Sequence, residues 1–124
     1  MNTDDQVEAV KEYLIYEIER HIGEEHAIKQ GDLLKAMHSS LPMSRDIIPN
    51  TRSLLTMIHD LRRSGIVIAS GARGYHKPAT AKEAHIYLET VLKSRAMDLL
   101  QTVRAQKRAI WNEYGRQLQM DEPK

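Results

Sequence analysis

Six histidines are present and cysteine is absent among the 124 residues. The missing thiols exclude disulfides, thiolate zinc sites and cysteine nucleophiles. The densest group of other metal-binding side chains is His21, Glu24, Glu25 and His26. Zinc ligands on one helix are spaced three or four residues apart and point to one side, whereas this group spans the expected end of a helix. We therefore interpret these histidines as surface residues and expect neither a metal nor a cofactor.

The motifs that mark common enzyme active sites are missing. The sequence has no G-x-x-x-x-G-K phosphate loop, no G-x-S-x-G nucleophile turn and no pair of carboxylates in an apolar stretch. Gly71 and Gly74 form a bare G-x-x-G, which clamps RNA in KH domains where it joins two helices. Here it joins two predicted strands, so it indicates a hairpin turn. We expect that the protein is not an enzyme.

The charged side chains are segregated along the chain, although the net charge is only +1. Residues 1–26 contain eight acidic and two basic residues. Residues 27–79 reverse this balance, with eight basic and three acidic residues. A basic segment beside an acidic one is typical of a surface that faces a polyanion. A solvated mixed surface gives a similar pattern, so charge alone does not decide between them.

The elements that must position these charges are predicted to be mainly helical. Apolar residues at steps of three and four predict an acidic amphipathic helix over residues 4–22 that ends near Gly23. A short strand is expected over residues 26–29. Asp32 is then expected to cap a short second helix.

A third helix and a β-hairpin follow in the basic segment. Either Ser44 or Asn50 is expected to cap a helix over about residues 50–64, and Gly65 is expected to stop it. The β-branched and glycine-containing stretch over residues 66–78 predicts two short strands joined by a turn.

A long helix is predicted over residues 80–120. Thr80 and Glu83 have the spacing of a capping box at its start, and no proline or glycine interrupts residues 80–114. Its apolar stripe becomes nearly heptad-spaced after Ala96, which is typical of a helix that meets a partner helix. We expect a homodimer through these side chains: Leu92, Ala96, Leu99, Val103, Ile110, Trp111 and Tyr114.

This order of elements is that of a winged helix-turn-helix domain. The stretch from Asn50 to Leu100 resembles small winged helix-turn-helix proteins of phages and prophages. The matching segments are Leu61-Arg62-Arg63-Ser64-Gly65-Ile66, Ile68-Ala69-Ser70, Gly74-Tyr75, Thr80 to Glu83 and Ser94-Arg95. The resemblance implies a mainly α fold with a small β-hairpin, in which a winged domain over residues 1–79 precedes a long C-terminal helix over residues 80–120. The arginine that usually opens the third helix of the family corresponds to Arg45 or Arg52.

The resemblance also implies contacts with double-stranded DNA, because a third helix of this kind enters the major groove while the wing lies on the adjacent backbone. The expected contacts at or near base edges are Asn50, Thr51, Arg52, Thr56 and His59. The expected phosphate or wing contacts are Arg45, Arg62, Arg63, Arg73, His76 and Lys77, with Lys29 and Lys35 as further candidates.

Two further functions stay open beside DNA binding in phage or prophage transcription control or replication. The same fold serves as a protein-binding adaptor in assembly or replication complexes. Binding to RNA or single-stranded DNA is less favoured, because only 5% of the residues are aromatic and stacking platforms need exposed rings. No apolar run approaches the roughly 20 residues of a membrane span, so we expect a single-domain cytoplasmic protein without membrane contact.

Overall fold

The computed structural model describes residues 3–121, with side chains described as far as residue 117. The protein divides into two units, of which the first ends at His85 and the second begins at Ile86. The fold is mainly α with one small antiparallel hairpin and a long C-terminal helix, as predicted. None of the described helices is long and apolar enough to cross a membrane.

The first unit begins with helices and ends with the hairpin. Its elements are α1 (Thr3–Glu19), the 3-10 helix η1 (Glu24–His26), α2 (Gln30–Ser40), α3 (Ser44–Ile47), α4 (Thr51–Arg63), β1 (Ala69–Gly71) and β2 (Gly74–His76). A continuous helical stretch follows and passes into the second unit. It consists of α5 (Ala81–Tyr87), the π-helix η2 (Leu88–Leu92) and α6 (Lys93–Asp121).

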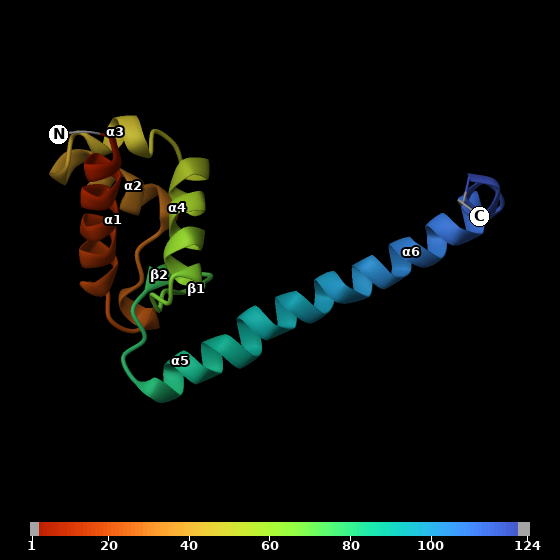
Figure 1. Ribbon diagram of the computed structural model, residues 1–124. Helices are drawn as coiled ribbons and strands as arrows, with labels where there is room; N and C mark the ends of the chain where they lie inside the picture. Colours follow the sequence, from red (N-terminus) through yellow and green to blue (C-terminus); the bar gives the residue numbers. More distant parts are fainter. Residues whose placement is uncertain (1–2, 122–124) are drawn as a thin grey trace. The chain divides into compact units, whose positions relative to one another are not determined.

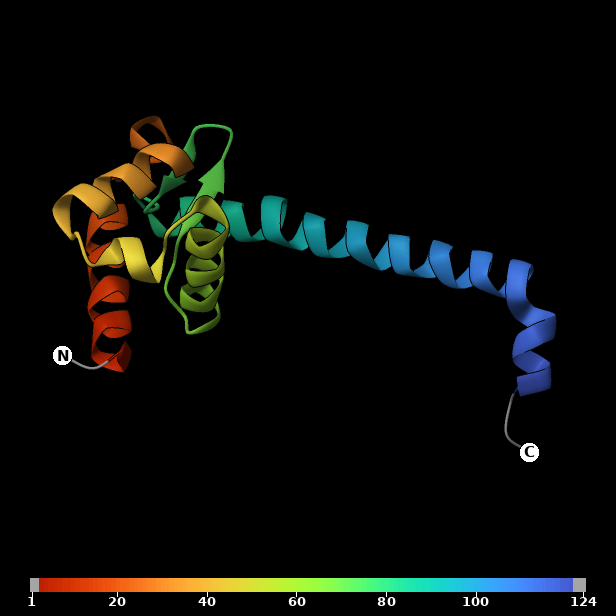
Figure 2. The same cartoon turned by 90° about the horizontal axis from the view of Figure 1, so that it is seen from above.

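One apolar core holds the first unit together. Figure 1 shows α2 between α1 and α4, and Figure 2 shows α3 crossing between α1 and α4. Each of the three long helices turns one apolar stripe inward. The buried side chains include Val10, Leu14, Ile18, Leu33, Met37, Ile48, Leu54, Met57, Ile58, Leu61, Ile68 and Tyr75. The core therefore fixes which side of α4 faces outward.

Helix α1 ends at Glu19, three residues earlier than predicted, because the chain after it pairs with the segment that follows β2. Gly23 N–H donates to Lys77 O at 2.8 Å, and Lys77 N–H donates to His21 O at 2.8 Å. Ile22 lies in this isolated parallel bridge and is exposed instead of extending the apolar stripe of α1. Backbone pairing between distant segments thus outweighs the helical pattern at residues 20–22.

The strand expected over residues 26–29 is reduced to a single residue. Ile28 N–H donates to Tyr75 O at 2.9 Å, and Tyr75 N–H donates to Ile28 O at 2.8 Å, whereas His26 belongs to η1. Helix α2 then begins at Gln30, so the prediction that Asp32 caps it is wrong. Asp32 lies in the first turn instead, where its negative charge favours the positive end of the helix dipole.

The entry to α4 is fixed by two polar contacts. His38 Nε2–H donates to Ile48 O at 2.8 Å, which ties α2 to the end of α3. Asn50 Oδ1 accepts from Ser53 N–H at 2.9 Å, and Asn50 N–H donates to Ser53 Oγ at 3.2 Å, which completes a capping box. Asn50 is therefore the cap of the third helix, whereas Ser44 begins α3 without a capping hydrogen bond. The predicted bounds of about 50–64 are confirmed within one residue.

The hairpin pairs Ser70 with Tyr75 and turns through Ala72 and Arg73. Gly74 has a φ of +114°, and a Cβ at this position would lie 2.1 Å from Ile28 O. Only glycine lets the backbone of this hairpin, residues 69–76 and hereafter the wing, approach Ile28 this closely.

The long helix starts as predicted but is not uniformly α-helical. Glu83 N–H donates to Thr80 Oγ1 at 3.1 Å, and Ala79 N–H donates to Glu83 Oε2 at 2.8 Å. Residues 88–92 form a π-helix, which the sequence analysis did not predict. Within it the Thr90 hydroxyl donates to Ile86 O at 2.6 Å, as the Thr102 hydroxyl does to Asp98 O in the α-helical α6.

Candidate nucleic-acid interface

The outer face of α4 carries polar side chains along its whole length. Arg52, Thr56, His59 and Arg63 follow one another at steps of four, three and four residues, and all four are exposed. Their side of the helix is opposite the buried Leu54, Ile58 and Leu61. Leu54, Leu55, Ile58 and Leu61 predict one apolar stripe from their spacing, but Leu55 is 45% exposed and lies beside the polar face. The face therefore offers hydrogen-bonding groups together with one apolar side chain.

The cap and two threonines of α4 differ in which of their side-chain hydrogen-bonding groups remain available to a ligand. Thr51 is exposed with its hydroxyl outside the capping box. Asn50 uses its side-chain oxygen as the cap, so only its amide NH₂ remains for a ligand. The Thr56 hydroxyl donates to Arg52 O at 3.1 Å and keeps its lone pairs as acceptors.

Four predicted contact residues are exposed arginines: Arg45, Arg52, Arg63 and Arg73. Arg45 lies on α3, two lie on α4, and Arg73 lies in the hairpin turn. None of the four forms an ion pair or a side-chain hydrogen bond within the part of the chain that the structure describes. Their charge is therefore not balanced by a neighbouring carboxylate.

Some basic residues elsewhere in the chain do have acidic partners. Lys11 Nζ lies 3.8 Å from Glu8 Oε1, and Lys93 Nζ lies 3.1 Å from Glu89 Oε2. Lys77, a predicted wing contact, is half-buried, and its Nζ lies 3.9 Å from Glu19 Oε1. Unpaired basic side chains also occur on α6, where Arg95, Arg104 and Arg108 form no ion pair among the described residues. What sets α4 apart is that its two unpaired arginines share one exposed face with Thr56 and His59.

Arg62 is directed toward the hairpin instead of solvent. Its Nε donates to Ile68 O at 2.9 Å, its Nη2 donates to Ser70 Oγ at 3.1 Å, and its guanidinium carbon lies 5.8 Å from the centre of the Tyr75 ring. These contacts hold the wing beside the carboxyl end of α4. Sequence reasoning grouped Arg62 with Arg63, although only Arg63 is exposed. Arg62 shares its side of α4 with the exposed Leu55, so helical periodicity does not separate the two arginines, and the packing of the hairpin against Arg62 does.

His76, another predicted wing contact, is buried in β2. It is 8% exposed, and its Nδ1 has no hydrogen-bond partner among the described residues. Its partner position across the hairpin is the buried Ala69. Arg62 and His76 therefore contribute to the packing of the wing, and we leave both out of the exposed surface.

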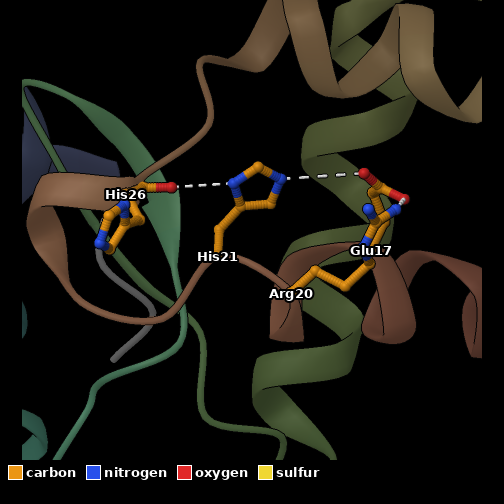
Figure 3. A network of polar contacts seen from close by, with 4 residues as sticks. All are labelled: Glu17, Arg20, His21 and His26. Atoms are coloured by element: carbon orange, nitrogen blue, oxygen red, sulfur yellow. Dashed lines mark hydrogen bonds and ion pairs between the residues drawn. The ribbon is translucent and has the colours of Figure 1, made fainter.

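Of the group His21, Glu24, Glu25 and His26, only the His21 side chain and the His26 carbonyl take part in the network shown in Figure 3, where their partners are Glu17 and Arg20. Glu17 is 6% exposed, with Arg20 Nη1 3.4 Å from Oε2 and His21 Nε2 3.8 Å from Oε1. His21 Nδ1–H donates to His26 O at 2.8 Å, which ties the end of α1 to η1. Among the described residues, no group of three or more His, Cys, Asp or Glu side chains could hold a metal ion. The network stabilises the segment that leads to Ile28.

Comparison of the chain with protein-family models, with curated proteins and with solved structures gives no significant match. The functional interpretation therefore rests on the chain's own geometry. Its strongest feature is the set of unpaired arginines on α3, α4 and the hairpin turn.

Proposed function

We propose that this protein is a winged helix-turn-helix protein that binds double-stranded DNA. The observation that carries the proposal is that the first unit presents Arg45, Arg52, Arg63 and Arg73 exposed and without an ion pair or side-chain hydrogen bond among the described residues. Two of them share the outer face of α4 with Thr56 and His59. Arginine without an internal carboxylate gains most from an external phosphate, which it binds through two parallel hydrogen bonds. Neutralised phosphates also release counterions, which favours binding further.

The outer face of α4 suits the major groove. An α-helix fits the groove, which is about 12 Å wide. Arg52 presents a guanidinium that matches the acceptors of guanine, and Thr56 and His59 continue the same exposed face. Leu55 offers an apolar contact for a thymine methyl group. Arg63 and Arg73 are assigned to phosphates, since they lie at the end of α4 and in the hairpin turn.

The surface is held in place before any ligand binds. The Asn50–Ser53 capping box and the His38–Ile48 contact fix the start of α4, and Arg62 fixes the wing at its other end. Preorganisation lowers the entropic cost of binding, because fewer groups must be ordered at the moment of contact. Through the sequence resemblance, we further propose that the protein acts in the cytoplasm, in phage or prophage transcription control or replication.

The test is a fluorescence anisotropy titration of a labelled 30-base-pair duplex at low salt. It compares the wild type with the variant Arg52→Ala/Arg63→Ala/Arg73→Ala and with Lys11→Ala/Lys82→Ala/Lys93→Ala as a control. Both variants lose three positive charges, but the control positions lie on α1 and on the α5–α6 helix. Circular dichroism confirms that each variant is folded.

We expect the arginine variant to bind duplex at least tenfold more weakly than the wild type, and the control to stay within about threefold, because contacts with phosphates and bases depend on position as well as charge. Equal losses for the two variants would mean that only net charge matters. Absence of duplex binding by the wild type would overturn the proposal in favour of a protein-binding adaptor.

A further inference from the structure

The second unit leaves a long row of apolar side chains in water. Leu99 is 68% exposed and Trp111 is 55% exposed, and Val103, Ile110 and Tyr114 are also exposed. All five lie on α6, which is α-helical from Lys93 to Asp121. A contiguous apolar stripe of this length on a helix is typical of a surface that packs against another helix.

The stripe repeats every eleven residues instead of every seven. The first set is Ala96, Leu99, Leu100 and Val103, and the second set, eleven residues later at each position, is Lys107, Ile110, Trp111 and Tyr114. Eleven residues correspond to three turns of about 3.67 residues, close to the 3.6 of a straight α-helix. The stripe therefore stays on one face of α6, and the heptad spacing expected earlier is only approximate.

The two sets differ in side-chain volume and charge. The first begins with the small Ala96 and has no charged member, whereas the second contains the long Lys107 and the large Ile110 and Trp111. In a parallel helix pair each set would face the same set of the partner. This would leave a gap at Ala96 and bring two Lys107 ammonium groups into the contact. An antiparallel helix pair that sets Ala96 of one copy opposite Ile110 of the other avoids both defects, because the large side chain fills the gap and the two Lys107 groups lie about 12 Å apart along the helices.

We propose that α6 pairs with α6 of a second copy of this chain in antiparallel orientation, with the two-fold axis at Val103. In this register Ala96 packs against the partner's Ile110, and Leu99 packs against the aliphatic stem of the partner's Lys107. Val103 meets the partner's Val103 on the axis. The stripe of each copy is thus covered by the same stripe of the other copy, as a two-fold interface requires.

The charges beside the stripe agree with this orientation. Arg95 and Glu113 lie on the same flank of α6, because they are eighteen residues, or five turns, apart. In the antiparallel register Arg95 lies close to the partner's Glu113, and the pair occurs twice. Pairs of opposite charge beside a helix interface favour the orientation that brings them together. In a parallel pair Glu113 faces the partner's Trp111 instead.

The orientation sets the spacing of the two copies. With the axis at Val103, the first residues of α6 are separated by twenty residues of helix, or about 30 Å. A parallel pair would bring the same residues side by side. The inference concerns self-association only, so it is tested without DNA and stands or falls separately from the proposed function.

Disulfide cross-linking tests the register, because the chain has no cysteine of its own. Single variants Ala96→Cys, Val103→Cys and Ile110→Cys are oxidised in a glutathione buffer, alone and as a mixture of Ala96→Cys with affinity-tagged Ile110→Cys. Asn112→Cys serves as the control, because residue 112 lies on the face of α6 opposite Val103. The products are separated on a non-reducing gel.

We expect the mixture to give a mixed dimer and Val103→Cys to give a dimer alone, whereas Ala96→Cys alone, Ile110→Cys alone and the control stay monomeric. Two copies of residue 96 would be about 21 Å apart along the helices, beyond the roughly 7 Å that a disulfide can bridge. Efficient cross-linking of Ala96→Cys alone would overturn the antiparallel register. Equal cross-linking of the control, or a monomer by sedimentation at micromolar concentration, would overturn the pairing itself.

Discussion

Residues 3–85 and residues 86–121 differ in where their apolar side chains lie. The first unit buries its apolar residues, with Leu54 at 0% exposure, and leaves arginines of α3, α4 and the hairpin turn without internal partners. In the second unit apolar residues such as Leu99 are exposed, and arginines such as Arg95 also form no ion pair among the described residues. The difference therefore lies in the apolar side chains, and it is the reason that we propose a second copy of the chain as the partner of the second unit and DNA as the partner of the first.

The largest expected effect comes from truncating one leucine in each unit. Leu54→Ala leaves a cavity in a closed core, so we expect the free energy of unfolding to fall by about 2–5 kcal/mol. Leu99→Ala removes a side chain that is 68% exposed in the single chain, so unfolding of the first unit should change by less than about 0.5 kcal/mol. Urea unfolding followed by circular dichroism measures both.

Sedimentation measures the self-association of the same two leucine variants, for which we expect the opposite order of effects. Leu99→Ala should weaken self-association, whereas Leu54→Ala should not as long as the helix remains folded. A Leu99→Ala variant that unfolds the first unit as strongly as Leu54→Ala would contradict the separation into two units.

A glycine in each unit gives the next contrast. Gly74→Ala should lower the free energy of unfolding by about 2–4 kcal/mol, because it forces a non-glycine residue to a φ of +114° and a Cβ to within 2.1 Å of Ile28 O. Gly115→Ala places a Cβ 3.3 Å from Trp111 Cδ2, but that ring is exposed and has room to shift. Its α6 helix should gain up to about 1 kcal/mol from the better helix former.

Thermal melts of the two glycine variants, followed by circular dichroism, check this contrast. A stable Gly74→Ala variant would mean that the contact between the wing and Ile28 is looser than described. A marked loss of helicity in Gly115→Ala would mean that the Trp111 ring cannot move.

The adjacent pair Arg62 and Arg63 gives the smallest expected change in stability and marks the border between core and surface. Arg62→Ala removes hydrogen bonds to Ile68 O and Ser70 Oγ, which we expect to cost about 1–2 kcal/mol of stability. Arg63→Ala should leave stability within about 0.5 kcal/mol, because its side chain is exposed and unpaired. Thermal melts of the two variants measure this difference in stability. Equal melting temperatures would contradict the different roles of the two arginines.

Local signals made much of the fold predictable from the sequence. The Asn50 cap and Gly65 bracket α4, the residues around Arg73 form the hairpin turn, and Thr80 with Glu83 starts the long helix. Each of these features depends on residues only a few positions apart. The exposure of Arg52 and Arg63 follows from the same helical periodicity that buries Leu54.

Features that depend on distant contacts could not be read from the sequence. The early end of α1 results from pairing of Gly23 with Lys77, and the single bridged residue Ile28 results from pairing with Tyr75. The role of Arg62 likewise depends on where the wing packs. The exposure of Leu55 depends on how α4 is rotated against the core, which one apolar side chain does not fix.

The most direct test of the central claim is the salt dependence of duplex binding, measured by anisotropy for the wild type and for Arg52→Ala/Arg63→Ala/Arg73→Ala. Each phosphate contact contributes roughly 0.9 to the slope of log Kobs against log salt concentration. Since Arg52 is assigned to a base edge, loss of the two phosphate contacts of Arg63 and Arg73 should make the slope shallower by about 1.8. Identical slopes for the two proteins would contradict the claim that these unpaired arginines bind DNA.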